Sequence, residues 1–154
     1  MTFLAHRKAN IKADILDIAS VTGSSVSVGT TYSITGTPLN TSATISSGYI
    51  VLHSSSNWRI EADCSIKYYW NSPASSRKFE IKFWDGSTYY GNRGIFDTGM
   101  SEIVSRINCT LFIPASSISS TLSLIPRVTA LSGTDLTSFA GTPSNEIRIL
   151  ELPT

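Results

Sequence analysis

The chain has little charge, little histidine and little cysteine, and each shortage narrows the possible functions. Charged residues make up 15% of its 154 residues, and the formal net charge is +1. Without a basic excess, the sequence gives no indication of nucleic-acid binding. No run approaches the roughly eighteen apolar residues of a membrane-spanning helix. Two cysteines and two distant histidines form no zinc pattern, so we expect no metal and no cofactor.

The N-terminus offers no export signal, because Arg7 and Lys8 follow a short apolar start rather than precede a long one. We therefore expect synthesis in a host cytoplasm, where cysteines stay reduced. Cys64 and Cys109 both fall on the apolar parity of a strand pattern. This favours two buried thiols over a disulfide bond.

Candidate catalytic groups are few. His53 lies in a serine-rich turn and His6 lies near the N-terminus, and neither has the partners of a nucleophile–base set. Glu61 and Asp63 share one strand face with Arg59. Basic neighbours on that face favour an ion-pair ladder, across strands or between subunits, over acid–base chemistry. We expect no enzymatic activity.

What the chain does have is regular alternation. From Trp58 to Trp70 the apolar side chains fall on one parity and mostly polar side chains on the other. Because a β-strand sends successive side chains to opposite faces, this segment predicts one half-buried strand. At the usual rise per residue it would extend roughly 43 Å, which implies a large two-layered β domain.

Shorter alternating stretches follow at regular spacing, and Asp85-Gly86 is a hairpin signal between two of them. The further expected strands cover 29–36, 48–52, 78–84, 88–90, 107–113, 122–130 and 146–152. This series predicts an all-β fold, a two-sheet antiparallel jelly-roll sandwich. We place an N-terminal arm and linker at 1–28 and the jelly-roll domain at 29–154. Residues 9–21 could form a strand or a helix.

An immunoglobulin-like sandwich is the alternative fold, because the two cysteines are spaced plausibly for a pair between sheets. However, Ile107 stands two residues before Cys109, where a tyrosine corner would have tyrosine.

Three passages carry a family resemblance: Ile45 to His53 followed by Asn57-Trp-Arg-Ile-Glu-Ala, then Phe79 to Asp85, and finally Glu146 to Pro153. Together they resemble the trimeric tumour-necrosis-factor-like jelly rolls of bacteriophage virions, over roughly residues 43 to 152. The resemblance implies a ten-strand jelly roll that assembles as a homotrimer. It also implies that the long strand, the 107–113 strand and the C-terminal strand share an inner sheet whose outward face approaches the threefold axis.

The last strand supports self-association independently. Ile147 and Ile149 lie on one parity, and Leu150 and Leu152 lie on the other. A strand that is apolar on both faces needs both faces covered, and in a two-sheet sandwich the outer one calls for another subunit. The residues that we expect at the trimer interface are Tyr69, Phe112, Leu150, Leu152, Arg59, Glu61 and Asp63.

Two functions follow from these patterns. The first is a trimeric capsid decoration or cement protein that binds the major capsid protein on the head surface of a virion. A mixed basic and apolar arm would dock it there, with contact residues Phe3, Leu4, Arg7, Lys8 and Lys12. The alternative is the receptor- or glycan-binding tip of a tail fibre, for which a few aromatic and polar residues are candidates, unless they pack within the sheet: Trp84, Tyr89, Tyr90, Asn92 and Arg93.

Overall fold

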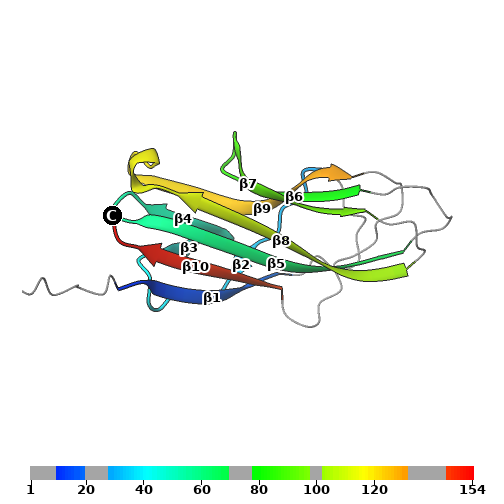
Figure 1. The fold of residues 1–154 in the computed structure, drawn as a ribbon, viewed down its shortest axis with the longest axis horizontal. Coiled ribbons are helices and arrows are strands. Elements are labelled where there is room, and N and C mark those ends of the chain that lie inside the picture. The colour runs from blue at the N-terminus through cyan, green and yellow to red at the C-terminus, as the bar shows by residue number, and fades with distance from the viewer. Residues whose placement is uncertain (1–9, 20–27, 70–77, 98–101, 132–144) are drawn as a thin grey trace, which may run out of the picture.

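A computed structural model describes residues 10–19, 28–69, 78–97, 102–131 and 145–154 of the chain. Two five-stranded antiparallel sheets face each other as a sandwich (Figure 1). The strands are β1 (Lys12–Ile18), β2 (Ile34–Thr35), β3 (Thr44–Ser46), β4 (Tyr49–His53), β5 (Asn57–Tyr69), β6 (Lys78–Trp84), β7 (Tyr89–Asp97), β8 (Glu102–Ile113), β9 (Thr121–Leu131) and β10 (Glu146–Leu152). One 3-10 turn, Ala115–Ser117, follows β8.

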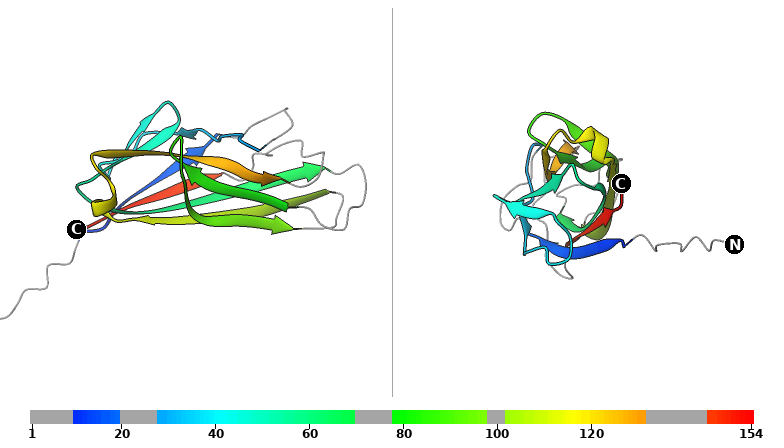
Figure 2. Two further views of the ribbon diagram at one scale, coloured as in Figure 1. Left: turned by 90° about the horizontal axis from the view of Figure 1, so that it is seen from above. Right: turned by 90° about the vertical axis from the view of Figure 1, so that its left-hand side faces the viewer.

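The inner sheet has the strand order β2-β1-β10-β5-β8, and the outer sheet has the order β3-β4-β9-β6-β7. The inner sheet thus joins the long strand, the 102–113 strand and the C-terminal strand, as expected from the resemblance. Two views at right angles show the sheets as two layers along the long axis (Figure 2). The predicted two-sheet jelly-roll architecture is confirmed.

The core lies between the sheets and follows the predicted parity. On β5, Trp58, Ile60 and Ala62 are buried, whereas Arg59 is exposed on the other face. The Trp58 indole nitrogen donates to the His53 carbonyl at 2.9 Å, so the ring is buried with its polar atom satisfied. Each aliphatic side chain buried this completely contributes about 1.5–3 kcal/mol of transfer free energy.

The N-terminal boundary predicted at residue 28 is wrong. Residues 12–18 form β1, which pairs along its full length with β10 in the middle of the inner sheet. The open choice between helix and strand for 9–21 is therefore settled as strand where the structure describes it. Lys12, expected in a docking arm, is the first residue of this strand.

Pro126 lies inside β9 rather than at a sheet edge. Its position is explained by its neighbours, because the β4 ladder ends at Leu124. Beyond that point no β4 residue needs an N–H donor from β9. The Pro126 carbonyl instead accepts from the Tyr32 amide at 2.9 Å. A proline is therefore tolerated within a central strand here.

Two edge strands from different sheets approach closely at Gly91. Its φ is +87°, and the pairing of β6 with β7 shifts register beside it. A Cβ at this position would lie 3.0 Å from the Thr110 carbonyl oxygen of β8. Glycine therefore permits both the irregular backbone and the contact that closes one side of the sandwich.

Candidate subunit interface

The outward face of the inner sheet is the candidate site, and its strand register defines it. One row crosses four strands, from Ala13 through Leu150 and Arg59 to Phe112. The next row along the sheet is Ile15, Arg148, Glu61 and Thr110. A third is Asp17, Glu146, Asp63 and Asn108. The face thus changes from apolar near the C-terminus of the chain to acidic at its far end.

The apolar end of this face is unusually open to solvent. Phe112 is 59% exposed and Ile15 is 57% exposed. Ile11, immediately before β1, is 59% exposed. Leu150 and Leu152 are half-buried beside them. Large apolar side chains gathered on one face indicate a surface that another protein covers.

The polar end holds a shallow hollow of about 200 Å³. It is lined by Glu61, Asp63, Asn108, Glu146 and Arg148. Between the two ends, the Arg59 guanidinium pairs with the Glu61 carboxylate at 2.7 Å. This ion pair runs along β5, within one strand, and the ladder expected across strands or between subunits stays a prediction. Among the described residues, no group of three metal-ligating side chains is suited to hold a metal ion.

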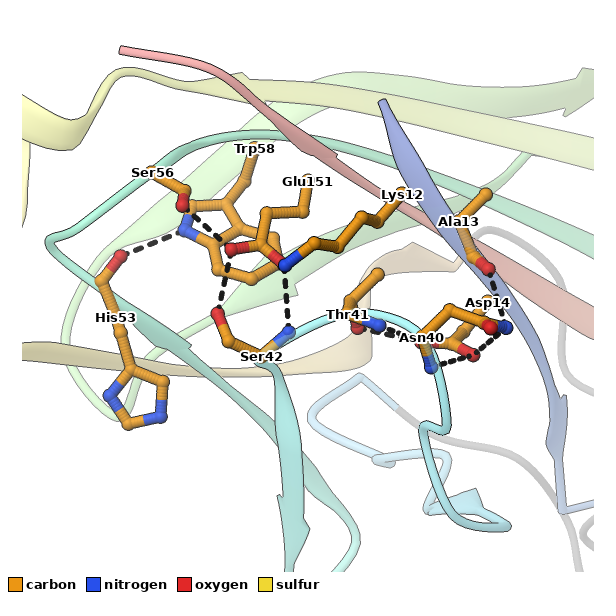
Figure 3. A network of polar contacts seen from close by, with 10 residues as sticks. All are labelled: Lys12, Ala13, Asp14, Asn40, Thr41, Ser42, His53, Ser56, Trp58 and Glu151. Carbon is orange, nitrogen blue, oxygen red and sulfur yellow. Dashed lines mark hydrogen bonds and ion pairs between the residues drawn. The ribbon is translucent and has the colours of Figure 1, made fainter. Parts of the chain in front are cut away.

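Asp14, on the inner side of β1, fixes residues 39–41 to this strand through hydrogen bonds (Figure 3). Asp14 accepts hydrogen bonds from the backbone amides of Leu39, Asn40 and Thr41 at 2.8–3.2 Å. The Thr41 hydroxyl also donates to Asp14, at 2.7 Å. Burial alone would raise the pKa of Asp14, but these hydrogen bonds outweigh it and lower the pKa from 3.8 to about 2. The loop is thereby fixed to the strand.

Glu151, on β10, likewise holds the neighbouring loop in place by accepting hydrogen bonds. It is only 8% exposed, and it accepts from the Ser42 amide at 2.8 Å and from the Ser56 hydroxyl at 2.7 Å. Lys12 places its ammonium 3.7 Å from the same carboxylate. Burial opposes ionisation, but the bonds from Ser56 and Ser42 and the charge of Lys12 lower the pKa of Glu151. Together Asp14 and Glu151 bind the 39–42 loop to the two strands that carry the apolar face.

The structure places most of the predicted interface residues on this one face. Arg59, Glu61, Asp63, Phe112, Leu150 and Leu152 all lie there. Tyr69 pairs with Glu102 at the end of β5, but its side chain lies outside the described part. Phe3, Leu4, Arg7 and Lys8 also lie outside the described residues.

Sequence reasoning missed Ile11 and Ile15. The signal that could have revealed them is the parity of Ile11, Ala13 and Ile15, which matches a strand with one outward apolar face.

The other candidate surface was the group of aromatic and polar residues near the β6–β7 turn. Trp84 and Tyr89 are paired across strands on the outward face of the outer sheet. Tyr90 points the other way and packs against the core. The side chains of Asn92 and Arg93 fall outside the described part. Of the three aromatic residues whose side chains are described, two, Trp84 and Tyr89, therefore lie together at the surface.

The architecture can now be compared with that of known proteins. The crystal structure of murine APRIL, a jelly roll of the tumour-necrosis-factor family, superimposes with a TM-score of 0.53. The match covers 93% of this chain and all of the other. The fold is a tumour-necrosis-factor-like jelly roll. At 6% identity, the likeness concerns the fold alone.

No protein-family model and no curated protein sequence matches the chain. No helix in the described residues is long and apolar enough to cross a membrane. The function must therefore be argued from the surfaces of this tumour-necrosis-factor-like jelly roll itself.

Proposed function

We propose that the protein is a structural, non-enzymatic subunit that assembles as a homotrimer through the outward face of the inner sheet. The observation that carries this proposal is the apolar end of that face, where Ile11, Ile15 and Phe112 are each more than half exposed. Trimeric assembly is what the sequence resemblance to virion jelly rolls implies.

The symmetry of a trimer constrains how this face is used. In a three-membered ring each subunit contributes two different surfaces, one to each neighbour. Phe112 and Leu150 then pack against a different patch of the next subunit, or against their own copies where they lie close to the axis. The Arg59–Glu61 ion pair lies beside the apolar end, and assembly would remove it from solvent while it is already paired.

Within this assembly role, we propose that the trimer decorates and stabilises a phage head. Its partner is then the major capsid protein, and residues before β1 form the tether. Three copies of a short tether gain affinity together, because the second and third contacts are effectively intramolecular. The alternative is the receptor-binding tip of a tail fibre, which the outward aromatic pair Trp84 and Tyr89 favours.

Two matched substitutions test the interface. Ile15 and Val28 are both 57% exposed in the single chain, but only Ile15 lies on the proposed face. Ile15→Asp should weaken the trimer, because a carboxylate would replace an apolar contact and only Arg148, opposite on β10, could partly compensate its burial. Val28→Asp should leave it intact. If both variants assemble equally well, this face is not the interface.

Labelling native particles tests the location. An antibody against the jelly roll should mark the whole head surface if the protein is a decoration protein. Label confined to the tail tip would replace this proposal with the fibre alternative, and unlabelled particles would overturn both. Deleting residues 1–10 leaves β1 intact, since that strand begins at Lys12. The shortened trimer should then fail to bind heads. Full occupancy would contradict the tether.

A further inference from the structure

The outward face of the outer sheet carries an aromatic and cationic cluster that assembly through the inner sheet does not use. Trp84 ends β6 and Tyr89 begins β7, and the two residues lie directly opposite each other. Tyr89 is 42% exposed, and Trp84 is partly exposed. The neighbouring strand β9 brings Arg127 to the same face, opposite Lys82.

The Arg127 guanidinium lies over the Trp84 ring and near the Tyr89 ring. Its guanidinium carbon lies 3.9 Å from the Trp84 ring centroid and 6.0 Å from that of Tyr89. Its Nε donates to the Gly29 carbonyl at 3.2 Å, which fixes the plane of the group. No ion pair joins Arg127 to a carboxylate within the part of the chain that the structure describes. A cation–π contact leaves the terminal N–H groups of a guanidinium able to donate to a ligand.

Two carboxylates close to this cluster, those of Glu80 and Asp85, accept hydrogen bonds from other groups. Glu80 is 7% exposed and accepts from the Thr129 hydroxyl at 2.7 Å, with the Lys82 ammonium 3.9 Å away. Asp85 accepts from the amides of Ser87 and Thr88 at 2.8 and 2.7 Å. Within the described residues, neither carboxylate therefore neutralises Arg127 through an ion pair.

The hydrogen bonds that Asp85 accepts also stabilise the β6–β7 turn. Besides the two amides, the Asp85 carboxylate accepts the Tyr90 hydroxyl at 2.7 Å. Tyr90 packs against the core, so this bond ties the turn to the body of the domain. Tyr89, between the turn and Tyr90, is thus presented in a fixed position. Preorganised aromatic side chains of this kind lose little entropy when a ligand binds.

We propose that Trp84, Tyr89 and Arg127 form a binding site for a saccharide that carries a carboxylate group. The C–H face of a pyranose ring stacks on aromatic rings such as Tyr89 and Trp84. A planar carboxylate matches the two parallel donors of a guanidinium. The site therefore combines a stacking surface with a single anion anchor, which suits a uronic acid unit.

Two other ligand classes fit the surface less well. An extended peptide binds by adding a strand to a free sheet edge. Here Arg127 lies on β9, an interior strand of the outer sheet, so its side chain projects from a face where no backbone edge is open. Single-stranded nucleic acid needs a groove with several cations along its backbone. This cluster offers one unpaired cation, and the chain has a formal net charge of only +1.

The test compares tetragalacturonate with its fully methyl-esterified form by isothermal titration calorimetry on the full-length protein. The two probes share the same rings and differ in the carboxylates. The acid should bind, and the ester should bind roughly tenfold or more weakly. Equal affinity for both probes, or no binding of the acid at millimolar concentration, would overturn the proposal. This comparison needs no variant, so it does not depend on how a mutant folds.

Variants then locate the site. Arg127→Gln should reduce affinity for the acid to that of the ester, and Tyr89→Ser should weaken both probes. Tyr49→Ser is the control, because Tyr49 is also a partly exposed tyrosine of the outer sheet but lies on β4. Unchanged binding by Arg127→Gln, or tighter binding of an oligothymidylate or a glutamate-rich peptide than of the acid, would contradict the assignment. The site is independent of assembly, so Ile15→Asp should leave binding per subunit unchanged.

Discussion

Phe112 lies directly opposite Arg59 on the antiparallel pair of β8 and β5, and Leu150 of β10 faces Arg59 from the other side. A charged side chain is thus enclosed between two apolar ones on an outward surface. The Arg59 guanidinium reaches along its own strand to Glu61 at 2.7 Å. The pair is largely solvated in one subunit, with the Arg59 side chain 53% exposed. In a trimer it would be covered by a neighbour.

Substituting one member of this pair should therefore affect assembly more than folding. Arg59→Met removes the ion-pair partner of Glu61 and leaves only Arg148, opposite on β10, near that carboxylate, so its burial should weaken the trimer. The double variant Arg59→Met with Glu61→Met should restore much of the association. Neither should change the stability of the subunit by more than about 1 kcal/mol, because the pair is exposed there. Concentration-dependent sedimentation velocity measures the first effect, and urea unfolding of the dissociated subunit measures the second. Equal association of both variants would argue against a buried pair.

Acid should loosen the loop that Asp14 holds. The folded-state pKa of Asp14 is about 2, below the ordinary value of 3.8. A lowered pKa means that the stabilisation is fully present above about pH 4 and is lost as the pH falls toward 2. The shift corresponds to roughly 2 kcal/mol. Urea unfolding followed by tryptophan fluorescence between about pH 7 and about pH 2.5 should show this loss.

Asp14→Asn should be less stable at neutral pH and should show a shallower acid limb. Asp17→Asn is the matched control, because Asp17 lies on the same strand but is exposed on the opposite face. If Asp14→Asn unfolds with the same pH dependence as the unchanged protein, the Asp14 hydrogen bonds do not hold the loop in solution.

The contact at Gly91 should not tolerate a side chain. Gly91→Ala would bring a Cβ within 3.0 Å of the Thr110 carbonyl oxygen and 3.3 Å of Leu111 Cβ. Gly86→Ala separates strain from steric overlap, because Gly86 also has a positive φ of +107° but has no atom within 4 Å of such a Cβ. Gly86→Ala should cost about 1–2 kcal/mol of unfolding free energy from backbone strain. Gly91→Ala should cost clearly more, as measured by thermal denaturation. Similar losses would mean that β7 and β8 can separate freely.

The sequence predicts the fold well where side chains alternate and fails where a buried position is charged. The parity of β5 and β10 is readable because Trp58, Ile60, Ile147 and Ile149 all point inward. β1 is obscured because Asp14 occupies an inward position, and a carboxylate there reads as a break in the pattern. Its partners are backbone amides 25–27 residues away. No local pattern reveals such a long-range contact.

The candidate site could likewise be predicted only in part, because its residues on β8 and β10 follow a readable alternation and those on β1 do not. Leu150, Leu152 and Phe112 are visible as apolar residues on polar parities. Ile15 was hidden because it belongs to the strand that the pattern failed to identify. Tyr90 was mistaken for a surface residue, since neighbouring tyrosines at a turn give no sign of which one points inward. Its inward position depends on the register between β6 and β7.

The cysteines should behave as two thiols. Cys109 is buried. The β5–β8 register pairs Cys109 with Ala62 and Cys64 with Ile107, so the two cysteines are diagonal neighbours. Diagonal positions are about 7–8 Å apart, beyond the usual Cα separation of a disulfide. Thiol titration in denaturant should find two groups, and the native protein should react slowly. A titration that finds none would show a disulfide.

Sedimentation equilibrium of the unmodified protein tests the central claim most directly. The outward face of the inner sheet exposes Ile11, Ile15 and Phe112 in a single chain, and we propose that a neighbouring subunit covers them. The measured mass at micromolar concentration should be three times 16.7 kDa. A stable monomer of 16.7 kDa at that concentration would contradict the trimer and the role assigned to this face.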